Sequence, residues 1–105
     1  MEFDSTLERI KNIIVDTVQP EKIILFGSRA TGRFTPESDY DVFVLKRGID
    51  NERVITRAIN RALYHGNIRE QVDIIAMDSS KWEKNKKNRF MIYSDINTQG
   101  VTLYG

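Results

Sequence analysis

Two short apolar segments of this chain each carry aspartate near their start, and this pattern constrains the fold more than any other feature. The segments "DYDVFVL", residues 39–45, and "QVDIIAM", residues 71–77, have the β-branched and aromatic content of buried strands. Aspartate is depleted inside strands. Asp41 and Asp73 therefore need a reason beyond solubility, whereas Asp39 alone, at the edge of its segment, is also explained as a turn residue.

The direction of these side chains follows from the alternation of a strand. Asp39 and Asp41 share one face with Phe43, and Asp73 shares a face with Ile75. Each face begins acidic and becomes apolar. If the two strands are parallel neighbours, the three carboxylates meet at one end of a sheet, at the mouth of the core.

Helical periodicity and chain breakers predict the remaining elements. We expect a helix at about 5–17, strands at 22–26, 39–45, 71–77 and 101–104, a loop at 27–38, a second helix from Asp50 or Asn51 to about Tyr64, a polar loop at 78–89 and a third helix at about 89–98. The first two strands can pair antiparallel, and a helical crossover makes the second and third parallel. The predicted class is α/β (α+β), a small mixed sheet with helices packed on it.

Length and composition limit the classes of protein. A chain of 105 residues is expected to form one domain, residues 1–105. Sixteen Lys and Arg against fifteen Asp and Glu give a net charge of +1, so neither nucleic acid nor membrane is an expected partner. The chain has no cysteine, no signal-like N-terminus and no apolar run near the ~20 residues that span a bilayer. The expected location is the cytoplasm.

Three converging carboxylates need a cation or must raise one another's pKa. Mg²⁺ is the favoured ion because it prefers hard oxygen ligands and completes its shell with substrate phosphates. Two such ions ~3.5–4 Å apart form the clamp of many phosphoryl-transfer sites. The predicted metal ligands are Asp39, Asp41 and Asp73.

The loop "GSRATGR", residues 27–33, directly follows a predicted buried strand. Backbone N–H groups at Gly27 and the hydroxyl of Ser28 can hold phosphate oxygens. The loop has the glycine spacing of a P-loop but lacks its Lys and Ser/Thr. Arg29 is either a further phosphate contact or a solvated loop charge.

Together, Gly27-Ser28, then Asp39-x-Asp41, then Asp73 within a later strand resemble the DNA polymerase β-like nucleotidyltransferase superfamily. The string "GSRATG…SDYDVFVL" in so short a chain is similar to the minimal nucleotidyltransferase (MNT) family in particular. The family usually has a second arginine where this chain has Thr31.

This resemblance implies the polymerase β-like nucleotidyltransferase fold and a set of roles. Gly27, Ser28 and Arg29 would bind the triphosphate of ATP, and Asp39, Asp41 and Asp73 would be the catalytic ligands of Mg²⁺. The resemblance also implies transfer of AMP from ATP to a tyrosine of a partner, a HEPN-type toxin that is a ribonuclease, so that the chain acts as its antitoxin. Two alternatives stay open: a small-molecule nucleotidyltransferase, and a binding antitoxin subunit without catalysis.

Three further features are open to more than one interpretation. His65, at a predicted helix end, is expected to interact with free carbonyl groups there. The basic segment 81–89 is expected to be a solvated mobile loop, or else a lid over phosphates or a partner contact. Trp82 within it is expected to be an exposed interface anchor.

Overall fold

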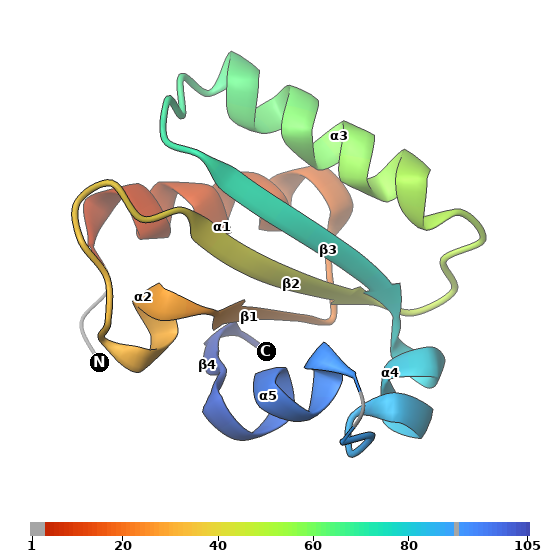
Figure 1. Ribbon diagram of the computed structural model, residues 1–105. Helices are drawn as coiled ribbons and strands as arrows, with labels where there is room; N and C mark the ends of the chain where they lie inside the picture. Colours follow the sequence, from red (N-terminus) through yellow and green to blue (C-terminus); the bar gives the residue numbers. More distant parts are fainter. Residues whose placement is uncertain (1–3, 90) are drawn as a thin grey trace.

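A four-stranded mixed sheet forms the centre of the molecule, with strand order β3-β2-β1-β4 (Figure 1). The computed structural model describes residues 4–89 and 91–105. The elements in chain order are α1 (Ser5–Val18), β1 (Lys22–Phe26), α2 (Ser28–Thr31), β2 (Tyr40–Lys46), α3 (Glu52–His65), β3 (Val72–Asp78), α4 (Ser79–Asn85), α5 (Ile92–Gln99) and β4 (Val101–Tyr104).

The predicted strand pairing is confirmed. Strands β1 and β2 are antiparallel, with Phe26 opposite Asp41. Strands β2 and β3 are parallel, with Asp41 opposite Asp73. The closing strand β4 pairs antiparallel with β1. Because Asp41 and Asp73 occupy matching positions of neighbouring parallel strands, their side chains leave the same face of the sheet at the same level.

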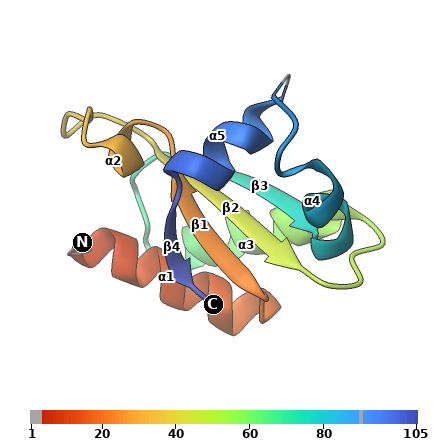
Figure 2. The same cartoon turned by 90° about the horizontal axis from the view of Figure 1, so that it is seen from below.

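Helices cover both faces of the sheet (Figure 2). Helices α1 and α3 cover one face, and the larger core lies between them and the alternate residues of β2 that include Val42 and Val44. Helices α4 and α5 cover the other face, where Phe43 and Leu45 pack with Ile96. The strand alternation that brings Phe43 and Leu45 to this second face brings Asp41 to it as well.

Side-chain caps define where the two long helices begin. Asp4 caps α1 by accepting a hydrogen bond from the Leu7 N–H at 2.6 Å, and the helix begins at Ser5 as predicted. Asn51 caps α3 by accepting from the Arg53 N–H at 3.0 Å, one of the two predicted caps. In both helices the cap oxygen satisfies an N–H that lacks an intrahelical partner.

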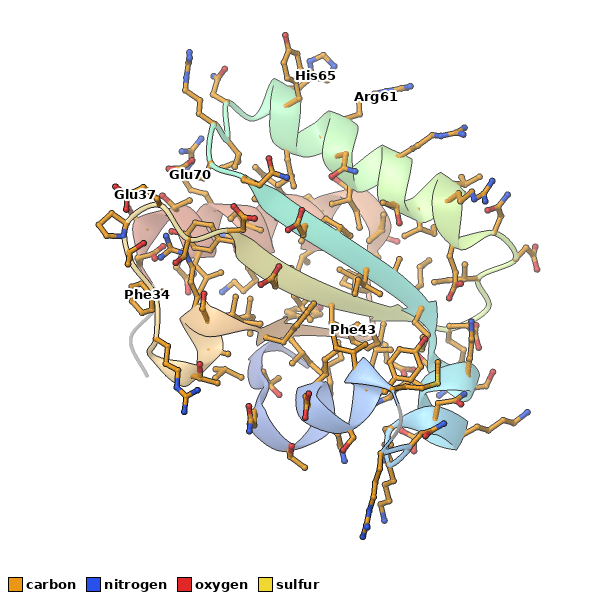
Figure 3. All side chains as sticks on the ribbon, viewed as in Figure 1. Phe34, Glu37, Phe43, Arg61, His65 and Glu70 are labelled. Carbon is orange, nitrogen blue, oxygen red and sulfur yellow. The ribbon has the colours of Figure 1, made fainter. Side chains whose placement is uncertain are left out.

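The segment predicted as a polar loop contains a helix, which corrects the sequence prediction. Asp78 caps α4 by accepting from the Ser80 N–H at 2.9 Å. Trp82 is not an exposed anchor: it is 5% exposed, and its ring centroid lies 4.9 Å from that of Phe43. Burial of one large aromatic side chain holds this lysine-rich turn against the sheet. Phe43 lies between the sheet and these helices (Figure 3).

The predicted third helix near the end of the chain is confirmed, but it is shorter than predicted. Helix α5 spans Ile92–Gln99 instead of 89–98, and its Ile96 is 1% exposed. Phe90, part of the predicted pattern, lies outside the described residues. No helix among the residues that the structure describes is long and apolar enough to cross a membrane.

Candidate active site

Three aspartates gather where β2 begins. Asp41 is the second residue of β2 and lies opposite Asp73 of β3. Asp39 lies one residue before the strand, and both Asp39 and Asp73 are exposed while Asp41 is half-buried. The backbone therefore brings these three predicted site residues to the same end of the sheet, with Asp41 innermost.

Burial and the two neighbouring carboxylates both affect the pKa of Asp41. Burial raises the pKa of the Asp41 carboxyl above its ordinary value, and the negative charges of Asp73 and Asp39 raise that pKa further. Like charges in a partly desolvated site disfavour ionisation of the most enclosed group. A cation between the carboxylates would reverse this effect, because it favours their charged forms.

Gly27 is the residue that lets the chain approach Asp41. Its φ of 74° and ψ of −157° lie in a region that is essentially reserved for glycine. A Cβ at this position would also collide with the Asp41 carboxylate oxygen Oδ2. Position 27 therefore requires glycine for two reasons: its backbone conformation, and the close contact with Asp41, a predicted metal ligand.

A cleft of about 500 Å³ opens beside Gly27 and Asp41. One wall comes from the end of β1 and the loop after it, and the other wall comes from α5. The lining residues are Phe26, Gly27, Ser28, Thr31, Arg33, Asp41, Ile92, Asp95, Ile96 and Gln99. The α5 residues were missed in the sequence because nothing local links the chain's last helix to a loop some sixty residues earlier. Only the tertiary structure shows this wall.

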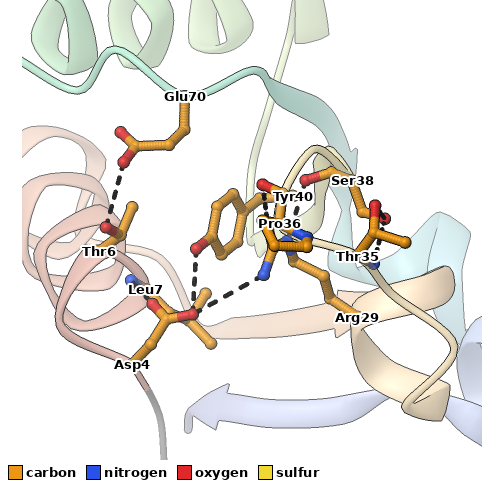
Figure 4. Close-up of polar contacts among 9 residues, drawn as sticks. All are labelled: Asp4, Thr6, Leu7, Arg29, Thr35, Pro36, Ser38, Tyr40 and Glu70. Carbon is orange, nitrogen blue, oxygen red and sulfur yellow. Dashed lines mark hydrogen bonds and ion pairs between the residues drawn. The ribbon is translucent and has the colours of Figure 1, made fainter.

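Arg29 does not line the cleft, and its side chain points toward the segment with Pro36 and Ser38 (Figure 4). It is 8% exposed, so the interpretation as a solvated loop charge is wrong. Its Nε–H donates to the Ser38 carbonyl oxygen at 3.0 Å, and its guanidinium lies 4.0 Å from the Tyr40 ring centroid. A cation over an aromatic face is favourable, more so when it is desolvated. A phosphate contact by Arg29 remains a prediction.

The Arg29 guanidinium is also linked to the first helix. Its Nη1 lies 3.9 Å from Asp4 Oδ2, and the Tyr40 hydroxyl donates to the same oxygen at 3.0 Å (Figure 4). Burial and the hydrogen bond to Asp4 raise the pKa of Tyr40. These contacts therefore connect α2, the start of β2 and the start of α1 through Arg29, Tyr40 and Asp4. They lie next to the acidic cluster in the chain, because Tyr40 stands between Asp39 and Asp41.

The donor set of the acidic cluster fits a divalent cation by its chemistry. Among residues 4–89 and 91–105, no three acidic or histidine side chains converge as a preformed metal centre would. Asp39, Asp41 and Asp73 nevertheless supply only hard carboxylate oxygens, and burial together with the charges of Asp73 and Asp39 raises the pKa of Asp41. Small side-chain rotations toward a shared cation would relieve that repulsion.

The remaining predicted residues lie elsewhere. His65 ends α3 and is exposed, as expected for a residue at a helix terminus, on the outer side of the helix (Figure 3). The basic segment forms α4 and the turn after it, and none of its residues lines the cleft.

With this geometry in place, comparison with known proteins gives the class. Residues 8–97 match the family described as polymerase β, nucleotidyltransferase, and the chain belongs to that family. It is 34% identical over 84 residues to the predicted protein adenylyltransferase MJ0604 of Methanocaldococcus jannaschii, with 80% of this chain and 78% of that protein covered.

Two solved structures share the fold. A predicted nucleotidyltransferase from Sulfolobus solfataricus matches with a TM-score of 0.56 and 23% identity, over 96% of this chain and 87% of that one. A toxin–antitoxin structure determined with AMP-PNP matches with a TM-score of 0.58 and 23% identity, over 93% of this chain and 72% of the other. The predicted polymerase β-like fold is confirmed.

Proposed function

We propose that this protein transfers AMP from ATP to a hydroxyl group of a partner protein, and that the partner is a toxin which this modification silences. The observation that carries the proposal is the placement of Asp41 opposite Asp73 beside the Gly27 turn, at the mouth of a cleft of about 500 Å³. This volume lies in the range of small-molecule sites.

The cleft residues divide into two groups with different tasks. Gly27 and Ser28 would bind the triphosphate, which is supported by their position in the cleft lining and by the room that Gly27 leaves beside Asp41. Asp39, Asp41 and Asp73 would hold Mg²⁺, as a pair of ions of the kind that clamps phosphoryl-transfer substrates. The bound cation supplies charge neutralisation for the triphosphate, and the chain supplies its position.

The transfer step is an in-line displacement at the α-phosphorus of ATP. The acceptor O–H bond breaks, a bond forms between the acceptor oxygen and the α-phosphorus, and the bond to pyrophosphate breaks. Asp73, exposed at the edge of the cluster, is placed to take the proton of the acceptor hydroxyl. Positioning of the two reactants supplies much of the rate gain for this chemistry.

A protein acceptor is supported by two of the relatives. One is named as a protein adenylyltransferase and shares 34% of its residues with this chain over the aligned region. Another protein of the same fold was solved in a toxin–antitoxin structure with AMP-PNP. A tyrosine of a HEPN-type toxin is the acceptor that we propose.

Incubation with the product of the neighbouring gene tests this proposal. With Mg²⁺ and ATP labelled at the α-phosphate, we expect the label on a tyrosine of that product, and no label when the γ-phosphate carries it. The variant Asp39→Ala/Asp41→Ala should abolish labelling and keep the circular dichroism spectrum of a folded chain.

Two results would contradict parts of the proposal. If the unmodified chain binds and silences the product but leaves it unlabelled, the protein is a binding subunit without catalysis. If label appears only on an added small hydroxyl compound, the acceptor is not a protein.

A further inference from the structure

The charge of the chain is unevenly distributed along its sequence. The segment 53–69, "RVITRAINRALYHGNIR", contains four arginines, one histidine and no acidic residue. The whole chain carries only one positive charge in excess, so the rest of it is net acidic. Overall charge, the basis for expecting no nucleic-acid partner, therefore does not describe this segment.

Helix α3 turns this segment into a basic track. Arg53, Arg57 and Arg61 follow one another at intervals of four residues, and each is exposed. Within the described residues none of the three forms an ion pair with an acidic side chain. Residues 53 and 65 are separated by about 18 Å at a rise of ~1.5 Å per residue. Arg61 and His65 point away from the sheet (Figure 3).

Exposed aromatic rings stand at the end of the track. The Tyr64 side chain is 78% exposed, and its ring centroid lies 5.6 Å from that of His65 in an edge-on arrangement. These two residues line a hollow of about 520 Å³ together with Asn67, Ile68 and Arg69. A ring this exposed contributes little to the core.

We propose that the outer face of α3, from Arg53 to the hollow at Tyr64, binds single-stranded nucleic acid. Arginines with fork-shaped donors suit phosphate oxygens, and exposed aromatic rings suit the stacking of bases. An acidic protein surface suits the outer face of α3 less well than single-stranded nucleic acid does. The middle of this face holds Arg57, Asn60 and Arg61, all exposed, and no exposed large apolar side chain lies between them to form the apolar core of a protein interface.

This surface is separate from the cleft. Helix α3 covers one face of the sheet, while the cleft opens toward α5 on the other face (Figure 1). Binding here does not depend on nucleotidyl transfer.

Fluorescence anisotropy with labelled 12-nucleotide oligouridylate and oligothymidylate tests the proposal, between 50 and 200 mM KCl. Three arginine–phosphate contacts predict a slope of log affinity against log salt of about −2 for a single strand. Arg57→Gln/Arg61→Gln should reduce the magnitude of the slope by about 1.4. Tyr64→Ala should weaken binding about tenfold at constant slope. Comparison of the two probes distinguishes a preference for RNA from equal binding of RNA and DNA single strands.

Matched controls locate the site. Lys84→Gln/Lys87→Gln removes two exposed charges on the other side of the sheet and should leave affinity and slope unchanged. Asp41→Asn should also leave binding unchanged, which separates this surface from the cleft. The proposal is overturned if neither probe binds, if the lysine variant loses as much as the arginine variant, or if a 12-residue oligoglutamate competes as well as the oligonucleotides. The last result would indicate an acidic protein partner.

Discussion

The parallel pair β2–β3 has aspartate at both of its ends, and the two ends use it in opposite ways. At one end Asp41 lies opposite Asp73, and at the other Lys46 lies opposite Asp78. Asp78 accepts hydrogen bonds from the N–H groups of Gly48 at 2.8 Å and Ile49 at 3.0 Å and also caps α4. The Ser80 hydroxyl also donates to Asp78, and this bond together with the backbone bonds holds the pKa of Asp78 well below its usual range, whereas burial and neighbouring charges raise that of Asp41.

This contrast separates a carboxylate that hydrogen bonds satisfy from one that belongs to the proposed metal site. Asp78 stabilises the fold because backbone donors satisfy its charge. Asp41 has acidic neighbours in place of donors, so its end of the sheet depends on other residues for its stability. Gly27 leaves room for the Asp41 carboxylate because it has no Cβ. Arg29 donates a hydrogen bond to the Ser38 carbonyl oxygen, just before β2 begins.

The largest expected effect is the loss of transfer at the acidic end. Asp41→Asn keeps the size of the side chain and removes its charge, so we expect labelling of the partner to fall at least about 100-fold. Without divalent ions the variant should be no less stable than the unmodified chain, since a repulsive charge is gone. Asp16→Asn, at an exposed position of α1, is the control for both measurements. Unchanged labelling in Asp41→Asn would remove this residue from the site.

The next effect concerns the glycine beside Asp41. Gly27→Ala should lower the free energy of unfolding by about 3 kcal/mol in urea titrations, because it combines backbone strain with a collision. Gly32→Ala is the matched control, since Gly32 has a φ of 80° but no atom within 4 Å of an added Cβ. Its loss should be about 1 kcal/mol, from strain alone. Equal losses would mean that contact with Asp41 is unimportant.

Arg29 is the third point at which the acidic end can be weakened. Arg29→Met keeps a long apolar stem but loses the bond to Ser38 and the interaction with Tyr40, so we expect a loss of about 2 kcal/mol. Arg29→Lys should recover only part of it, because it lacks the planar fork. If Arg29→Met is as stable as the unmodified chain but labelling falls, phosphate binding is its main role instead.

The smallest effects are differences in pH dependence, and they have opposite signs at the two ends. The folded pKa of Asp78 is lowered, so its stabilisation is present above the unfolded value of ~3.9 and is lost as the pH falls below it. The folded pKa of Asp41 is raised, so the folded state binds its proton more tightly and stability falls as the pH rises past ~3.9.

Urea midpoints at pH 3, 4.5 and 6 without divalent ions measure both effects. The deficit of Asp78→Asn relative to the unmodified chain should shrink toward pH 3. The urea midpoint of Asp41→Asn should rise relative to that of the unmodified chain as the pH rises. The same sign for both variants would contradict the contrast between the two ends.

Much of the site was predictable because its determinants are local. The apolar alternation of β2 and β3 places Asp41 and Asp73 on one face, and a helix-length connection makes the strands parallel. The Gly27-Ser28 turn directly after a buried strand marked the loop. That Asp39 precedes the strand and is not part of it changes only the boundary.

The incorrect predictions came from side chains whose surroundings are supplied by distant segments. Trp82 was expected at the surface because its neighbours are lysines, but Phe43 of another strand offers it an aromatic contact. The alternative that Arg29 is a solvated loop charge is wrong because Tyr40 and Ser38 enclose its side chain. Composition of the local segment carries no information about either partner.

The sequence by itself determined which residues face together along each strand, because side-chain alternation is a property of the backbone. It thereby determined the acidic end and the glycine that must lie beside it. Only the tertiary structure decided that α5 forms the second wall of the cleft and that Arg57 and Arg61 of α3 form no ion pair among the described residues. Such contacts join segments far apart in the chain, and they arise when apolar faces pack together.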